Sequence, residues 1–142
     1  MNEPVSTLYQ PSGLEHVFVY GTLRRGGAND ITRLDPPGRF VGPASVRGWL
    51  YSLGRYPGLL LDERGPAVAG EVYHLDPKLE RVLDGIEEVY PQQRDEYLKR
   101  RVTVEVAGRM LDCLVYEIHP RYVQGRAVLS PPDWLQHAPA AG

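Results

Sequence analysis

The chain has 142 residues, a formal net charge of −2 at pH 7, a pI near 6.1 and a single cysteine. This length suits one domain, and the near-neutral charge argues against a general nucleic-acid or anionic-membrane partner. One cysteine excludes an intramolecular disulfide framework and fits a cytoplasmic protein. The first residues lack the pattern of a signal peptide, and no stretch approaches the roughly 18 apolar residues of a membrane span.

Turn residues and short apolar runs alternate along the chain. Residues 1–14 are polar and predict a flexible N-terminal tail, followed by a single domain over 15–137 and a C-terminal tail over 138–142. Within the domain, short helical turns are expected near 31–34 and 133–136. Period-two and apolar runs predict strands at 16–20, 44–54, within 56–66, at 67–75, 97–106 and 109–118.

Residues 76–88 carry the clearest helix signal. Asp76 is a suitable N-cap and Pro77 a suitable first helical residue. Apolar residues three or four apart follow them: Leu79, Val82, Leu83 and Ile86. About six strands and one clear helix predict an α+β fold, with a curled or barrel-like sheet.

Several enzyme classes lack their motifs here. The histidines stand singly, without metal-ligand spacing, so the sequence suggests no metal site. Neither a phosphate-binding GxxxxGK[ST] loop nor a GxSxG serine elbow is present. Cys113 lies in the apolar run LDCLVYEI, which favours a buried core residue over a nucleophile.

The carboxylates of the predicted helix differ in their expected exposure. At roughly 100° per residue, Glu87 falls at the border of the apolar stripe, whereas Glu88 falls nearly opposite and should be solvated. Partial burial raises the pKa of a glutamate and makes it a better proton acceptor near neutral pH. From the pattern alone, an ordinary border residue is the favoured interpretation of Glu87.

The stretch HVFVYGTLRRGG joins a strand to a glycine turn. Consecutive backbone N–H groups in such a turn can hold a carboxylate or a phosphate, and Gly21 would permit an unusual backbone angle or a close approach. A plain strand-to-helix turn is the alternative interpretation. Arg24 and Arg25 are expected to be solvated loop residues.

Taken together, five segments resemble the gamma-glutamylcyclotransferase-like family, and most nearly its gamma-glutamylamine cyclotransferase branch. The resemblance covers roughly residues 17–118. It is carried by VFVYGTLRRGG, YSLGRYPG, GEVYHLDPKLERVLDGIE, EYLKRRVTV and CLVYEI. It implies a small, mixed, mostly antiparallel barrel-like sheet with one or two flanking helices and a cavity at one mouth.

The resemblance also implies a reaction, in which a γ-glutamyl-amine becomes 5-oxoproline and a free amine. The substrate's α-amine attacks its own γ-carbonyl, so neither a protein nucleophile nor a cofactor is required. Glu87, at the family's LDxxE position, would act as general base and then acid. The other implied site residues bind substrate: Tyr20, Gly21, Thr22 and Leu23 in the YG[ST]L loop, and Tyr116. The YGTL amides would fix the substrate's α-carboxylate or support the oxyanion.

Some features remain open at this level. Lys99 stands where the family commonly has arginine, so any bidentate pairing there is lost or altered. The leaving amine, expected to be selected by loops near 56–58 and 88–96, and the oligomeric state cannot be read from the chain. An alternative function is a module that binds a small carboxylate metabolite in the YGTL cavity without chemistry. That alternative gains if an arginine such as Arg100 or Arg101 pairs with Glu87. A weaker alternative is an interaction protein using Arg24 and Arg25.

Overall fold

The computed structural model describes residues 9–137, which form one curled sheet with a single α-helix in that range. The elements in chain order are β1 (His16–Val19), β2 (Phe40–Ser52), β3 (Pro57–Leu61), β4 (Ala67–His74), α1 (Pro77–Ile86), β5 (Tyr97–Val106) and β6 (Arg109–Ile118). Short 3₁₀ turns lie at Ile31–Arg33, Pro120–Tyr122 and Trp134–Gln136. No helix of the described part of the chain is long and apolar enough to cross a membrane.

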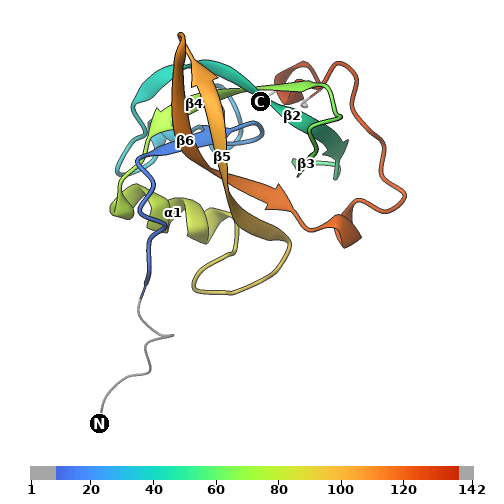
Figure 1. Cartoon of the computed structure of the whole chain (residues 1–142). Coiled ribbons are helices and arrows are strands. Elements are labelled where there is room, and N and C mark those ends of the chain that lie inside the picture. Colours follow the sequence, from blue (N-terminus) through green and yellow to red (C-terminus); the bar gives the residue numbers. More distant parts are fainter. Residues whose placement is uncertain (1–8, 138–142) are drawn as a thin grey trace.

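The six strands pair in the order β3-β2-β4-β1-β6-β5. Neighbouring strands run antiparallel except β1 and β6, which run parallel with Val17 opposite Leu114. The sheet curls until β3 packs across β6, with α1 below it (Figure 1). A Cβ on Gly58 of β3 would lie 2.7 Å from the Cβ of Ile118, so this closure requires glycine. The predicted α+β, mixed and mostly antiparallel barrel-like sheet is confirmed.

Both faces of β1 are buried, which explains why its sequence is apolar almost throughout. Val17 and Val19 join the core cluster that includes Leu79 and Leu83 of α1. Phe18, which points to the opposite face, joins the cluster inside the curl of the sheet. Cys113 belongs to this inner cluster and is fully buried, and burial raises the pKa of its thiol to about 12. It is therefore a core residue, as predicted.

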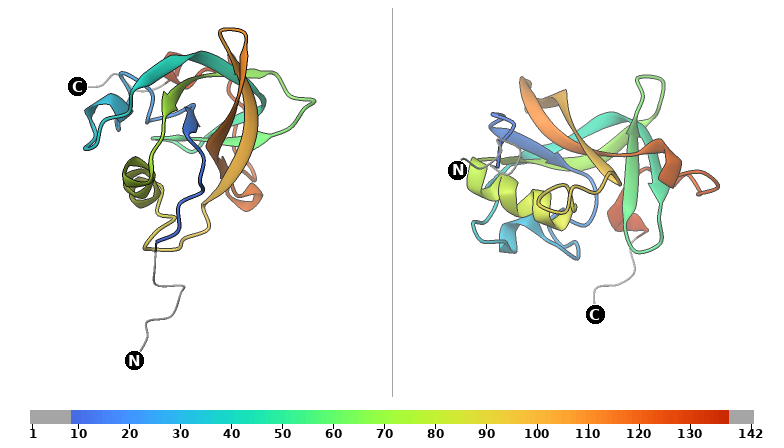
Figure 2. Two further views of the ribbon diagram at one scale, coloured as in Figure 1. Left: turned by 60° about the vertical axis from the view of Figure 1, so that its left-hand side comes forward. Right: turned by 90° about the horizontal axis from the view of Figure 1, so that it is seen from below.

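Helix α1 begins as the sequence predicts and ends two residues early. The Asp76 side chain accepts a hydrogen bond from the Leu79 amide, and Pro77 opens the helix. Glu87 is the C-cap, and Glu88 has a positive φ of 58°, so neither is a helical residue. The two views of Figure 2 show α1 beside the segment that leads into β1.

The predicted apolar stripe of α1 is only half correct. Leu79 and Leu83 are buried, but the other buried residues of the helix are Glu80 and Asp84, whereas Val82 and Ile86 are only partly buried. The buried face is rotated because two carboxylates find partners in the protein interior. Hydropathy cannot indicate that pairing.

Other elements differ from expectation at their ends. β2 starts at Phe40 rather than at residue 44, because Phe40 pairs with Tyr73 of β4 although Gly42 and Pro43 disfavour a strand. Residues 9–14 have no regular secondary structure, but Tyr9 and Ser12 hydrogen-bond to α1. The rest of the expected N-terminal tail and the whole expected C-terminal tail lie outside the described residues.

Candidate active site

A cavity of about 450 Å³ opens where β1 and β6 end. Because these two strands are parallel, the turn after β1 and the last residues of β6 meet at one edge of the sheet. The end of α1 and the start of β3 close the cavity. All the residues predicted from the sequence line it: Tyr20, Gly21, Thr22, Leu23, Glu87 and Tyr116.

The YGTL turn (residues 20–23) is held by its carbonyl groups. The oxygens of Gly21, Thr22 and Leu23 accept hydrogen bonds from backbone amides farther along the chain, at 3.1, 2.8 and 2.9 Å. Within residues 9–137, the N–H groups of the same three residues have no acceptor. The turn therefore presents three consecutive residues whose amides are free to bind an anionic group.

Gly21 is required by close packing rather than by an unusual backbone angle. A Cβ at this position would lie 2.7 Å from the Cγ of Pro57, the first residue of β3. Any side chain here would push β3 away from the turn and open the wall of the cavity.

Glu87 brings a carboxyl group to the cavity at the end of α1. Its amide donates to the Leu83 carbonyl at 2.9 Å, which fixes the backbone, and its side chain is half-buried. Burial, followed by the charges of Glu96 and Asp84, raises its pKa to about 8. The helix C-terminus, with its partial negative charge, acts in the same direction.

No ion pair of Glu87 occurs within the described residues. Arg100 pairs with Glu117 at 3.0 Å and Arg101 with Asp112 at 2.5 Å, both on the β5–β6 hairpin. The carboxyl group of Glu87 is thus available to a ligand.

Three tyrosines form a rigid wall around Glu87. The Tyr20 hydroxyl donates to the Tyr116 carbonyl at 2.6 Å and accepts from the Leu59 amide at 3.3 Å. The Tyr97 hydroxyl donates to the Pro57 carbonyl at 2.6 Å. Burial raises the pKa of all three phenols, and the nearby charge of Glu87 adds to the effect. They are neutral at physiological pH and cannot serve as bases.

Behind this wall lies a buried cluster that hydropathy did not reveal. The Lys99 ammonium pairs with Asp84 at 2.8 Å and also with Glu80. We call these three residues the Lys99 cluster. The chain thus places one ammonium between two carboxylates of neighbouring helical turns.

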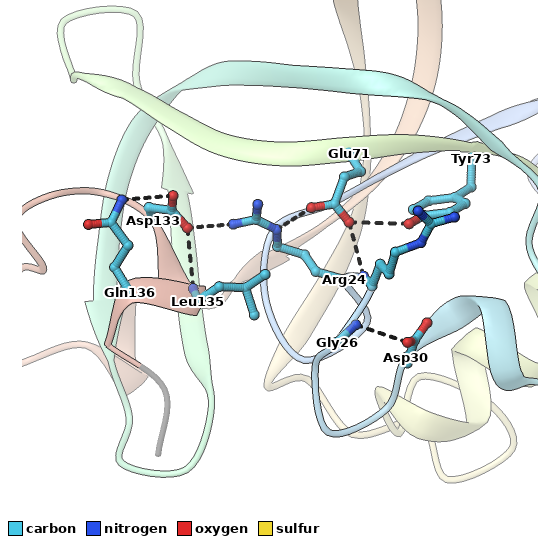
Figure 3. A network of polar contacts seen from close by, with 9 residues as sticks. Arg24, Gly26, Asp30, Glu71, Tyr73, Asp133, Leu135 and Gln136 are labelled. Carbon is cyan, nitrogen blue, oxygen red and sulfur yellow. Dashed lines mark hydrogen bonds and ion pairs between the residues drawn. The ribbon is translucent and has the colours of Figure 1, made fainter. Parts of the chain in front are cut away.

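The prediction for Arg24 is wrong. Its side chain is only 11% exposed, and its guanidinium pairs with Glu71 at 2.5 Å and Asp133 at 2.6 Å (Figure 3). The partners lie 47 and 109 residues away in sequence, so spacing could not indicate them. These three residues form the Arg24 network. Arg25 is exposed as expected, although its amide donates to Glu71 at 3.0 Å.

The rim is formed by the two loops expected to contact the leaving group. Arg55, Tyr56 and Pro57 lie on one side, and Glu88 and Glu96 on the other. The Tyr56 hydroxyl donates to Glu96 at 2.6 Å and joins the two loops. Glu88 is 44% exposed and lies 3.7 Å from Arg94, so it is less solvated than expected. Within residues 9–137, no group of three acidic, histidine or cysteine side chains is placed to hold a metal ion.

The curled sheet, with a cavity where the parallel strands β1 and β6 end, defines a small α+β protein with a candidate active site. The model of the family described as gamma-glutamyl cyclotransferase, AIG2-like, matches residues 17–136. The chain belongs to this family.

Named relatives agree with this assignment. Bovine gamma-glutamylaminecyclotransferase is 32% identical over 96% of this chain and 79% of its own length. A putative gamma-glutamylcyclotransferase of Vibrio cholerae is 38% identical over 84% of this chain and 95% of its own length. A crystal structure of an AIG2-like protein from mouse superimposes with a TM-score of 0.67 at 27% identity, covering 85% of this chain and 88% of that one.

Proposed function

We propose that this protein is a cofactor-free gamma-glutamyl cyclotransferase that converts a γ-glutamyl-amine to 5-oxoproline and a free amine. Family membership and the names of the relatives support the reaction class. The observation that carries the proposal is a single cavity lined by an unpaired carboxyl group, Glu87, and by the free amides of the YGTL turn.

In the proposed mechanism, the substrate supplies the nucleophile and Glu87 moves the protons. Ionised Glu87 removes a proton from the α-ammonium group, and the freed amine attacks the γ-carbonyl carbon. The new ring C–N bond forms and the original amide C–N bond breaks. Two protons pass from the α-nitrogen to the leaving nitrogen, so the product amine departs as an ammonium ion and Glu87 is ionised again.

The YGTL amides stabilise negative charge in this mechanism. They would hold the α-carboxylate of the γ-glutamyl group, or the oxyanion that develops on the γ-carbonyl oxygen. In either arrangement the turn fixes amine and carbonyl within reach of each other, and such positioning is a large part of the advantage of an intramolecular reaction.

A module that binds a carboxylate metabolite without turnover is the second candidate, but the contacts of Glu87 do not favour it. A binding module would be favoured by a Glu87 held in an ion pair. The two nearby arginines considered for that role, Arg100 and Arg101, pair with other residues.

The test is to incubate the purified protein with γ-glutamyl-lysine and γ-glutamylated aminoglycosides and to measure 5-oxoproline. We expect turnover in the wild type and a loss of at least about 100-fold in Glu87→Gln, which keeps the shape but cannot accept a proton. Glu63→Gln, at an exposed glutamate after β3, is the matched control. Absence of 5-oxoproline from every γ-glutamyl donor, or equal rates in Glu87→Gln and the wild type, contradicts the proposal.

A further inference from the structure

The two carboxylates of the Lys99 cluster are buried, and each accepts hydrogen bonds from several donors. The side chains of Glu80 and Asp84 are 1% and 2% exposed. Besides Lys99, Glu80 accepts hydrogen bonds from the amide and the hydroxyl of Ser12, at 2.9 and 3.0 Å. Asp84 accepts one from the Tyr9 hydroxyl at 2.9 Å. The segment before β1 thus closes the cluster from outside and shields it from solvent.

Asp84 alone connects this cluster to the cavity. Its Oδ1 accepts a hydrogen bond of 2.6 Å from the hydroxyl of Tyr116, whose residue lines the cavity, while its Oδ2 pairs with Lys99. The Tyr116 carbonyl in turn accepts from the Tyr20 hydroxyl at the start of the YGTL turn. Lys99 is therefore linked to the turn through Asp84 and Tyr116, with one hydrogen bond at the hydroxyl of Tyr116 and another at its backbone carbonyl.

Asp84 also acts on Glu87 through its charge. It precedes Glu87 by three residues, so the two side chains leave neighbouring positions on the same side of the chain. The titratable groups that act on or face Glu87 come from α1, the 88–96 loop, the YGTL turn, β5 and β6: Asp84, Glu96, Tyr20, Tyr97 and Tyr116. Among these five, Asp84 is the carboxyl-bearing residue that is buried inside the protein.

We propose that Asp84 is a positioning residue of the active site, which holds Tyr116 against the cavity wall and places a carboxylate beside Glu87, and that the ion pair with Lys99 holds Asp84 in place. The proposal rests on the proposed function for its kinetic consequence. Its structural part concerns the state of Glu87 and stands without turnover.

The decisive comparison is Asp84→Asn with Glu80→Gln. Both substitutions remove one carboxylate from Lys99 at similar burial, so both cost stability. Only Asp84→Asn removes the negative charge that faces Glu87, and it replaces the charged acceptor of the Tyr116 hydroxyl with a weaker, neutral amide oxygen. We expect the titration of the Glu87 carboxyl carbon, followed by NMR, to move to lower pH by about one unit in Asp84→Asn, because a neighbouring negative charge is lost. In Glu80→Gln it should stay at the wild-type midpoint.

Kinetics give a second readout on γ-glutamyl-amines. We expect the acid limb of kcat/KM to shift with the Glu87 titration, and the plateau of kcat to fall about 10-fold to 100-fold as Tyr116 loses its anchor. Equal titration midpoints in Asp84→Asn and the wild type overturn the proposal, even if the protein turns over no substrate. If no variant turns over substrate but the titration shifts as expected, the proposed function is contradicted and the positioning role of Asp84 stands.

A further variant covers the case in which Asp84→Asn does not fold. Tyr116→Phe removes the same hydrogen bond from the other side and leaves the pairing of Asp84 with Lys99 in place. We expect a fall in the kcat plateau comparable to that of Asp84→Asn. An unchanged plateau in Tyr116→Phe overturns the proposal.

Discussion

The two walls of the cavity are each supported from behind by a cation between two carboxylates, but the supports differ in kind. Behind the YGTL turn, the arginine of the Arg24 network reaches Glu71 on β4 and Asp133 near the C-terminal end of the described chain. Behind Glu87, the lysine of the Lys99 cluster pairs with Glu80 and Asp84 of a single helix. The first joins distant segments with a planar, directional group, and the second neutralises one helix face with a compact charge. The two carboxylates behind the turn thus come from distant segments, whereas the two behind Glu87 come from a single helix.

The largest effect is expected at the more deeply buried support. Lys99→Met leaves Glu80 and Asp84 buried without their cation, and removing one partner of a buried pair costs about 3–5 kcal/mol. We expect a corresponding fall in the free energy of unfolding in urea at pH 7. Lys78→Met, at the chain's only other lysine and exposed on α1, is the control. Equal losses in both variants would mean that the Lys99 cluster contributes nothing specific.

A somewhat smaller loss is expected at the turn. Arg24→Met leaves Glu71 and Asp133 without their guanidinium, but Asp133 is 23% exposed and regains water, so we expect about 2 kcal/mol. Because the turn loosens, KM for a γ-glutamyl-amine should rise more than kcat falls. Arg25→Met changes the exposed neighbouring residue and should preserve both constants. A kcat effect alone would place Arg24 in the chemistry rather than in support of the turn.

The raised pKa of Glu87 predicts a pH-dependent difference in stability. The folded protein binds a proton at Glu87 up to about pH 8, whereas the unfolded chain releases it near the ordinary glutamate pKa of 4.5. The contribution of neutral Glu87 is therefore fully present below about pH 4.5 and is lost as pH rises through about 8. Relative to the wild type, Glu87→Gln should gain on the order of 2 kcal/mol between pH 6 and pH 8. Parallel pH profiles of unfolding free energy for the two proteins would contradict a raised pKa.

The smallest effect on stability is expected at Tyr20, which joins the YGTL turn to β6. Tyr20→Phe removes the hydroxyl that donates to the Tyr116 carbonyl and accepts from the Leu59 amide. Loss of these buried contacts should cost about 1–2 kcal/mol in urea unfolding. Tyr51→Phe, at a half-buried tyrosine of β2, is the comparison. A loss as large as that of Lys99→Met would show that the walls are coupled through Tyr20 more strongly than their separate supports suggest.

The sequence predicts the strands and the helix that carry this site better than it predicts the buried ion pairs behind them. Local patterns are sufficient for β5, β6 and the start of α1, because alternation, a hairpin turn and an N-cap are properties of neighbouring residues. The border position of Glu87 follows from helix periodicity in the same way. The prediction for Arg24 is wrong because its partners are close only after folding. The burial of Glu80 and Asp84 is not predicted at all, because a hydropathy scale counts a paired carboxylate as exposed. Gly21 shows an intermediate case, in which the need for glycine is predictable but Pro57 as its cause is not.

The contact between Asp133 and Arg24 links the C-terminal part of the described chain to the YGTL turn. This segment folds back along β2, where the Leu129 amide donates to the Leu50 carbonyl, and buries Trp134 (Figure 1). Ending the polypeptide before Pro131 would spare all six strands and every residue lining the cavity, yet would remove an anionic partner of Arg24. Trimming or fusing this end is therefore an intervention at the YGTL turn, although it changes no residue that lines the cavity.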